Sequence, residues 1–246
     1  MTTKESTPLI SYHADPALKA ALVIEIGKHE QADQIIKGTY GSINGQWRGC
    51  AIGCSLRSLN IMKQQTDPNR RTGDHDRFPK ELGWPLWLAH IEDTIFENLP
   101  DALAKTWPRR IAEAIPVGAV IDEMVLAKIL RWMLADTEFG VRYATDDETI
   151  RGHIDGVIAG FDAELSTGGH ATDEQREAAA RAAMAANDDD SLAAWSAFSA
   201  WSAWDATSLP PWKKADPFFS ALSEFLLALL RALPTCEVMS QKRLHL

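Results

Sequence analysis

The chain has 246 residues, of which 46% are hydrophobic and 24% charged, and its formal net charge at pH 7 is −9. This composition predicts a globular protein with a sizeable core and excludes a low-complexity or fibrous chain. Three cysteines do not suggest a disulfide framework, and no apolar run follows a basic start as in a secretion signal. We therefore expect a cytoplasmic protein with reduced thiols.

The negative charge belongs to the second half of the chain. Residues 1–120 hold 14 basic and 14 acidic side chains, whereas residues 121–246 hold 11 basic and 20 acidic ones. An acidic half repels nucleic acids and anionic membranes, so we expect neither as a partner. Residues 48–80 are a local exception with a net charge of +4.

The pair Asp15-Pro16 predicts the start of the first helix, because aspartate caps a helix and proline fits its first turn. Gly38 predicts its end at about residue 37. A glycine-rich loop should follow. Apolar periodicity and helix-end signals then predict a helix over 49–62, a helix over 85–99 and a short helix between Pro108 and Pro116. Residues 63–80 are polar and rich in turn-forming residues, which predicts a loop. The polar loop is expected to be either a functional lid or a mobile segment.

Apolar residues with a 3.6-residue period predict two more helices, over 121–135 and 147–165. After a linker at 166–171 the chain becomes rich in alanine and tryptophan. Its last apolar stretch, 217–233, is too short to span a bilayer and carries charged residues, so we expect no membrane segment. No pair of strands is indicated. We expect an all-α fold of eight or nine helices, with 15–165 as an irregular helical domain, 172–233 packed on it, and 1–14 and 234–246 as tails.

Residues 38–54, GTYGSINGQWRGCAIGC, combine five glycines with two cysteines. The stretch lacks the glycine patterns of phosphate-binding loops, and a helix rather than a strand precedes it. Two hypotheses remain open. The glycines permit positive φ angles and close packing of helices. Alternatively, the turn at 49–53 binds an anion through Arg48, Gly49, Gly53 and Arg57.

Cys50 and Cys54 share a helical face, but one C-x-x-x-C pair without a second cysteine pair is a poor zinc signature. Structural thiols are the simpler interpretation. In the first helix, Glu25, His29 and Asp33 lie on or beside the apolar stripe at intervals of four. Such groups either reach solvent and form ion pairs, or build a metal or catalytic site. The candidate metal ligands are Glu25, His29, Cys50 and Cys54.

The polar loop and the helix over 85–99 add further titratable residues. His75 lies between two aspartates and is a candidate general base. Glu92 lies at the edge of the apolar face of the helix. His90, Asp93 and Glu97 cluster on the opposite side, which is typical of a surface that faces solvent. The candidate catalytic residues are His29, Asp33, His75 and Glu92.

Four segments resemble an uncharacterised family of bacteriophage and bacterial proteins over about residues 29–120: HEQADQIIKGTYG, GCAIGCSL, HDRFPKELGWPLWLAHIEDTIFENLP and WPRRIAEAIPVGA. The second half is similar in composition to immunity proteins. The resemblance implies a phage or prophage setting, with the host-cell cytoplasm as the location. It implies no catalytic residues.

In WSAFSAWSAW an aromatic residue recurs at every third position, which predicts either a central packing helix or a surface that docks a partner. Because no catalytic signature is present, we expect a non-catalytic accessory protein that binds another protein through Trp195, Trp201 and Trp204. The alternative is an enzyme or binding protein for an anionic, nucleotide-like small molecule, with its site in the N-terminal half. The sequence leaves open whether that site uses a metal ion or another cofactor.

Overall fold

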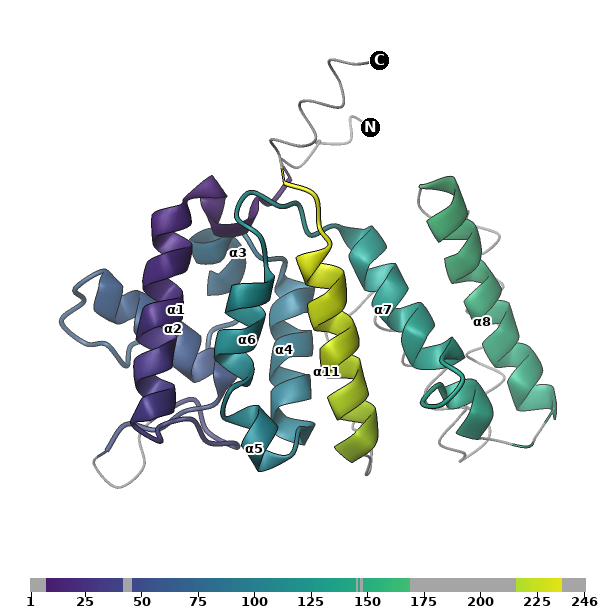
Figure 1. Ribbon diagram of the computed structural model, residues 1–246, viewed down its shortest axis with the longest axis horizontal. Coiled ribbons are helices and arrows are strands. Elements are labelled where there is room, and N and C mark those ends of the chain that lie inside the picture. The colour runs from purple at the N-terminus through teal and green to yellow at the C-terminus, as the bar shows by residue number, and fades with distance from the viewer. Residues whose placement is uncertain (1–7, 42–45, 145, 147, 169–215, 236–246) are drawn as a thin grey trace, which may run out of the picture. The chain divides into compact units, whose positions relative to one another are not determined.

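The computed structural model describes residues 8–41, 46–144, 146, 148–168 and 216–235 (Figure 1). Within these residues the fold is all-α and contains no named strand, which confirms the predicted fold class. Three isolated β-bridges join short extended pieces: Ile10 with Val120, Ile35 with Gly49, and Ala119 with Thr235. None of the described helices combines the length and the hydropathy that a bilayer-spanning segment needs.

The described helices include, in the predicted order, every predicted helix that falls within these residues, together with four short helices that were not predicted. They are η1 Ser11–Ala14, α1 Pro16–Gln31, α2 Ala51–Met62, α3 Arg77–Leu82, α4 Leu86–Asn98, α5 Asp101–Ala104, α6 Trp107–Ala114, α7 Glu123–Ala135, η2 Val141–Ala144, α8 Glu148–Thr167 and α11 Asp216–Arg231. The predicted cap of α1 is present, because an Asp15 carboxylate oxygen accepts a hydrogen bond from the Ala17 N–H at 2.8 Å. α1 ends earlier than predicted because the chain turns and pairs with Gly49: Ile36 N donates to Gly49 O, and Gly49 N donates to Gln34 O, each at 2.9 Å.

Contacts divide the chain into two compact units, Met1–Asp122 with Ser223–Leu246, and Glu123–Leu222. The division falls before α7, whereas composition indicated a boundary at 166–171. The reason is that α8 packs on α7, so these two helices belong to one unit. The tryptophans proposed to bind a partner and the helix predicted from residue 172 lie outside the described residues.

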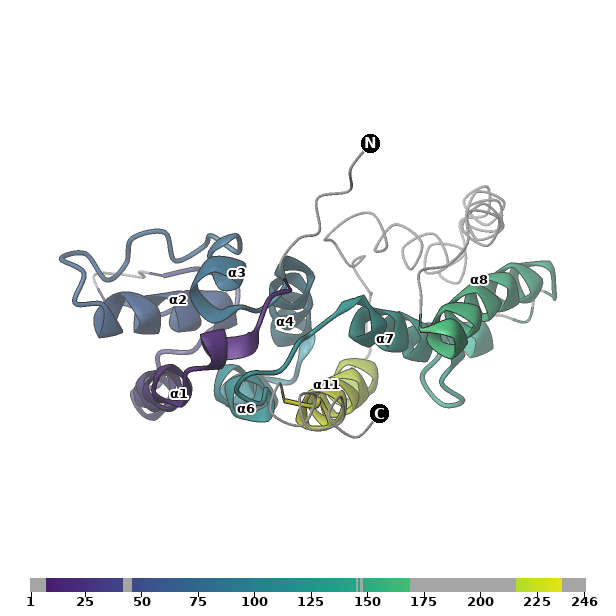
Figure 2. The same ribbon diagram turned by 90° about the horizontal axis from the view of Figure 1, so that it is seen from above.

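In the first unit, α2 and α6 contact each other, and each of them also contacts α1 and α4 (Figures 1 and 2). α2 is buried along most of its length, from Ala51 to Leu56 and again from Ser58 to Asn60. Glycine, cysteine and serine at 53, 54, 55 and 58 give this helix little side-chain bulk. Neighbouring segments can therefore approach its backbone closely.

The segment before α1 is fixed to this unit, although residues 1–14 were predicted to be a flexible tail. The Ser11 N–H donates to Ala119 O at 2.9 Å, and the fully buried Tyr12 hydroxyl donates to Ala112 O. Tyr12, His13 and Ala14 have positive φ angles of 54°, 52° and 58°. The sequence prediction was wrong for residues 8–14 because a left-handed turn of non-glycine residues has no sequence signature.

In the second unit, the apolar residues Ile154, Val157 and Phe161 recur along α8 at intervals of three and four and are buried. The Arg131 guanidinium on α7 donates to the Asp162 carboxylate on α8. Helix packing in this unit therefore follows the periodicity that the sequence showed.

Candidate functional site

One face of α4 is covered by segments that are distant in the sequence. Tyr40 comes from the glycine-rich stretch, and Cys50 is the residue that precedes α2. His75 comes from the loop that leads into α3. We call this cluster the α4 site, and it consists of Tyr40, Cys50, His75, His90, Asp93 and Glu97.

Cys50, Asp93 and Glu97 each offer one ligand atom, and these atoms lie within 4.8 Å of one another. In the described part of the chain, this is the one group of three or more such ligand atoms. Ligands of a tetrahedral ion with bonds of about 2.0–2.3 Å lie roughly 3.3–3.8 Å apart. Side-chain adjustments of about 1 Å would therefore bring the three atoms to metal-binding distance.

The two carboxylate oxygens of Asp93 have different surroundings. Oδ2 lies 3.2 Å from the Tyr40 hydroxyl and 3.2 Å from His75 Nε2, so two donors hold this oxygen. Oδ1 is buried and has no hydrogen-bond partner among the described residues. Ligating carboxylates are commonly fixed by outer hydrogen bonds while another lone pair binds the metal. Asp93 therefore resembles a ligand whose orientation is already set.

Glu97 lies one helical turn after Asp93. Both of its carboxylate oxygens lie 3.0 Å from the Gly38 N–H. Gly38 has a φ of +77°, a conformation that glycine adopts without strain. Burial raises the pKa of Glu97, and the nearby Asp93 raises it further. The hydrogen bond from Gly38 lowers this pKa but does not outweigh burial. This carboxylate is thus held in place beside a second negative group.

Cys50 supplies the sulfur of the group and is only 1% exposed. Burial, followed by the charge of Asp93, raises the pKa of its thiol, although the N–H groups of Gly53 and Ile52 act in the opposite direction. Cys54 is also buried, and its thiol donates to Gly49 O at 3.6 Å. Burial, and then Cys50, raises the pKa of Cys54. Neither thiol is therefore reactive as a free nucleophile.

Aromatic rings close the outer side of the α4 site. The imidazoles of His75 and His90 stack with centroids 4.6 Å apart and an interplanar angle of 7°. The Tyr40 ring meets His75 edge-on at 5.9 Å. Burial, and then Asp93, raises the pKa of Tyr40 to about 12, so its hydroxyl remains a hydrogen-bond donor at neutral pH. Burial, and then His75, lowers the pKa of His90.

The glycines of residues 38–54 serve close packing around two aromatic side chains. A Cβ on Gly53 would lie 2.6 Å from the Tyr40 carbonyl oxygen. A Cβ on Gly49 would lie 2.8 Å from the Trp47 ring, and one on Gly41 would also collide with that ring. These contacts support the packing hypothesis for the glycines that the structure describes.

The Gly53→Ala variant is expected to lower the free energy of unfolding by about 1–3 kcal/mol, because overpacking forces backbone shifts. The matched control is Gly27→Ala in α1, where a Cβ would make an ordinary 3.8 Å contact with Arg109. That control should stabilise the protein by about 0.5–1 kcal/mol, since alanine favours helix over glycine. Urea unfolding of both variants measures the difference. Equal stabilisation by both changes would contradict the close contact at Gly53.

The residues predicted to bind an anion are engaged elsewhere. The Gly49 N–H donates to Gln34 O, as described above. Arg48 lies 3.9 Å from the Asp33 carboxylate. The Arg57 guanidinium lies 4.7 Å from the centroid of the Trp47 ring and donates to Asn69. Gly53 packs on Tyr40, so these four residues have structural contacts.

The candidate residues Glu25, His29 and Asp33 point to different neighbours, and Asp33 lies beyond the end of α1 at Gln31. Glu25 pairs with Lys28, and Asp33 pairs with Lys105 at 2.6 Å. His29 is buried; its Nδ1 lies 2.7 Å from Gln34 Oε1, and its ring lies 4.7 Å from that of Trp47. Burial lowers the pKa of His29. Of the four predicted metal ligands, Cys50 alone belongs to the ligand group described above.

Glu92 was predicted to lie at the edge of an apolar face, and the structure buries it completely. Neither carboxylate oxygen has a hydrogen-bond partner among the described residues. Burial, and then the adjacent Asp93, raises the pKa of Glu92 well above its ordinary value. The Glu92 side chain interacts electrostatically with Asp93, Tyr12 and Cys54, but it is not one of the three ligand residues.

The interpretation of His90, Asp93 and Glu97 as a solvent-facing cluster was wrong. The Asp93 side chain is 19% exposed, and the other two residues are half-buried. Periodicity identifies the face of a helix but not the segments that cover it. The sequence feature that could have indicated the site was the grouping of three titratable residues on one face of this helix, together with Cys50 and His75 in other segments.

Comparison of the chain with protein-family models, curated proteins and solved structures gave no significant match. The resemblance to a bacteriophage and bacterial family therefore stays a prediction, and function has to be argued from the site itself.

Proposed function

We propose that the first unit binds one divalent transition-metal ion through Cys50, Asp93 and Glu97. On this proposal the protein is a metal-dependent enzyme or binding protein for an anionic small molecule. The observation that carries the proposal is the convergence of one thiol and two carboxylates within 4.8 Å. The buried, unpaired Oδ1 of Asp93 supports it independently.

The donor set favours an ion of the zinc type. A thiolate prefers borderline or soft metals, and carboxylate oxygens complete a mixed site. Three protein ligands leave a coordination position for water or substrate, as in catalytic zinc sites. A metal in such a site supplies Lewis acidity and lowers the pKa of bound water. The residues of the chain would orient the ion and exclude bulk water around it.

Local charge supports a cation at this place. Two carboxylates lie side by side with a thiol, and His75 is the one basic side chain in contact with Asp93 within the described residues. Lys37, whose charge lowers the pKa of Glu97, donates to Leu99 O and lies 3.2 Å from Asp101. A divalent ion would offset the repulsion between Asp93 and Glu97.

Titration of the purified protein with Co²⁺ tests the proposal. We expect binding of one equivalent with a thiolate-to-cobalt charge-transfer band in the near ultraviolet. Cys50→Ser should lose this band and the tight binding. The matched control Cys54→Ser changes an equally buried thiol four residues further along the chain and should retain both. The proposal fails if the wild type gives no such band, or if Cys50→Ser keeps it.

The predicted protein-binding function depends on Trp195, Trp201 and Trp204. These residues lie outside the described part of the chain, so that function stays a prediction.

A further inference from the structure

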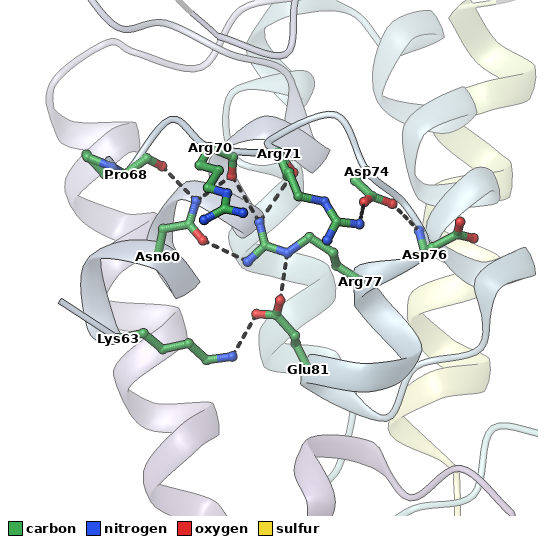
Figure 3. A network of polar contacts seen from close by, with 9 residues as sticks. All are labelled: Asn60, Lys63, Pro68, Arg70, Arg71, Asp74, Asp76, Arg77 and Glu81. Carbon is green, nitrogen blue, oxygen red and sulfur yellow. Dashed lines mark hydrogen bonds and ion pairs between the residues drawn. The ribbon is translucent and has the colours of Figure 1, made fainter. Parts of the chain in front are cut away.

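The loop between α2 and α3 contributes His75 to the α4 site, and its backbone is fixed by side-chain hydrogen bonds. Figure 3 shows the centre of these contacts, where the side chains of Asn60 and Arg77 point toward the loop carbonyls. Asn60 Nδ2 donates to Pro68 O and to Arg70 O, each at 2.8 Å. The middle of the loop is thereby tied to α2.

Arg77 joins every part of this network. One of its terminal nitrogens donates to Arg70 O and Arg71 O, each at 3.3 Å. The other donates to Asn60 Oδ1 at 2.7 Å, and Nε donates to Glu81 Oε1 at 2.6 Å. The residue is only 7% exposed. A planar guanidinium with several fixed donors can hold such a set of acceptors, whereas a lysine ammonium cannot reach all of them in the same geometry.

The remaining loop contacts lead from Arg77 to His75. Arg71 pairs with Asp74, whose carboxylate also accepts from the Asp76 N–H at 3.2 Å. The Phe78 N–H donates to His75 O at 3.0 Å. A Cβ on Gly73 would lie 3.0 Å from the Tyr40 ring, so the loop rests against that ring. The loop therefore forms one wall of the α4 site. It is shorter than the predicted 63–80, because α3 begins at Arg77.

We infer that His75 orients the proposed metal ligand Asp93 by a hydrogen bond to its carboxylate, and that Arg77 is the residue that positions His75. This inference rests on the proposed function. His75 Nε2 lies 3.2 Å from Asp93 Oδ2, and the stacked ring of His90 fixes the plane of the imidazole. A donor on Oδ2 orients the carboxylate and leaves Oδ1 to the metal. Partners of this kind typically contribute about 10–100-fold to metal affinity.

The test is the affinity for Co²⁺ of His75 and Arg77 variants. His75→Leu removes the donor and should weaken binding by about 10–100-fold. His75→Gln places an amide N–H near the position of Nε2 and should recover most of that loss. Arg77→Lys keeps the charge but loses the fork of donors, so it should weaken binding in the same direction. Arg131→Lys, an arginine of the second unit, is the matched control and should not change the affinity.

A double-mutant cycle separates positioning from general destabilisation. If Arg77 acts through His75, adding Arg77→Lys to His75→Leu should cause little further loss of affinity. Unchanged Co²⁺ affinity in His75→Leu, or losses that simply add in the double variant, would overturn the inference while the charge-transfer band of the wild type still upheld the metal site. Absence of that band in the wild type would instead remove the proposed function, and this inference with it.

Discussion

Replacement of Arg77 by methionine is expected to lower the free energy of unfolding by about 3–5 kcal/mol at pH 7, the usual loss when one partner of a buried ionic contact is removed. Methionine keeps the length of the side chain but donates no hydrogen bond. Asn60 Oδ1 and Glu81 Oε1 then lose their Arg77 donor. The carbonyls of Arg70 and Arg71 also lose a donor but keep the Asn60 side chain and the Asp74 N–H, respectively. Buried acceptors without a donor pay the full desolvation cost.

Chemical denaturation of wild type and Arg77→Met measures this loss. Arg131→Met is the control, because Arg131 also pairs with a carboxylate but its side chain is 40% exposed. Exposed pairs contribute about 0–1 kcal/mol, so the control should change stability little. Similar losses in the two variants would contradict the central role of Arg77 in fixing the loop.

The contribution of Arg77 should also depend on pH. Burial alone would raise the pKa of Glu81, but the hydrogen bonds and charges of Arg77 and Lys63 outweigh burial and hold this pKa below its ordinary value. A carboxyl with a lowered folded-state pKa stabilises the protein above its unfolded pKa of about 4.3 and loses that effect as the pH falls through the folded value. The stability difference between wild type and Arg77→Met should therefore shrink below about pH 4.

Helix positions were predictable because they depend on local signals. The cap at Asp15 and the proline after it mark the true start of α1, and the periodicity of residues 85–99 matches α4 within a residue. The end of α1 was missed because pairing of residues 34–36 with Gly49 is a long-range contact. Tertiary contacts override local propensity at such places.

The candidate site was less predictable because its residues come from three segments: the glycine-rich stretch, the loop before α3, and α4. The sequence singled out Cys50 and His75 for chemistry but associated Cys50 with residues of α1. The structure places it beside Asp93 and Glu97 of α4. Spacing within one helix cannot show which distant loop covers it, and the Gly53–Tyr40 contact that brings Tyr40 to α4 has no sequence motif. Packing of α2 on α4 creates the site, and packing follows from the whole fold.

The Glu92→Met variant is expected to raise the free energy of unfolding by about 1–3 kcal/mol at pH 7, the range for a buried polar group without a partner. In the unfolded chain this carboxylate is hydrated and ionised. Folding buries it completely, and neither oxygen gains a hydrogen bond among the described residues. Methionine has a similar length and adapts to irregular apolar surroundings, so it should fill the same space.

Glu113→Met is the control for this change, because Glu113 on α6 is 46% exposed and pairs with Arg109 at 2.9 Å. Removal of that surface pair should cost at most about 1 kcal/mol. Thermal and chemical denaturation of both variants give the comparison. A loss of stability in Glu92→Met would mean that the carboxyl has a stabilising partner.

Measurement of Co²⁺ binding by Glu92→Met then tests whether the destabilising carboxyl of Glu92, next to Asp93, contributes to metal binding. Glu92 is not one of the three ligand residues, and its raised pKa limits its negative charge beside Asp93, so we expect the metal affinity to remain unchanged while stability rises. Buried groups that oppose folding are found preferentially at functional sites, where stability is sacrificed for activity. If the affinity instead falls as stability rises, Glu92 belongs to the α4 site and its burial is part of the function of that site.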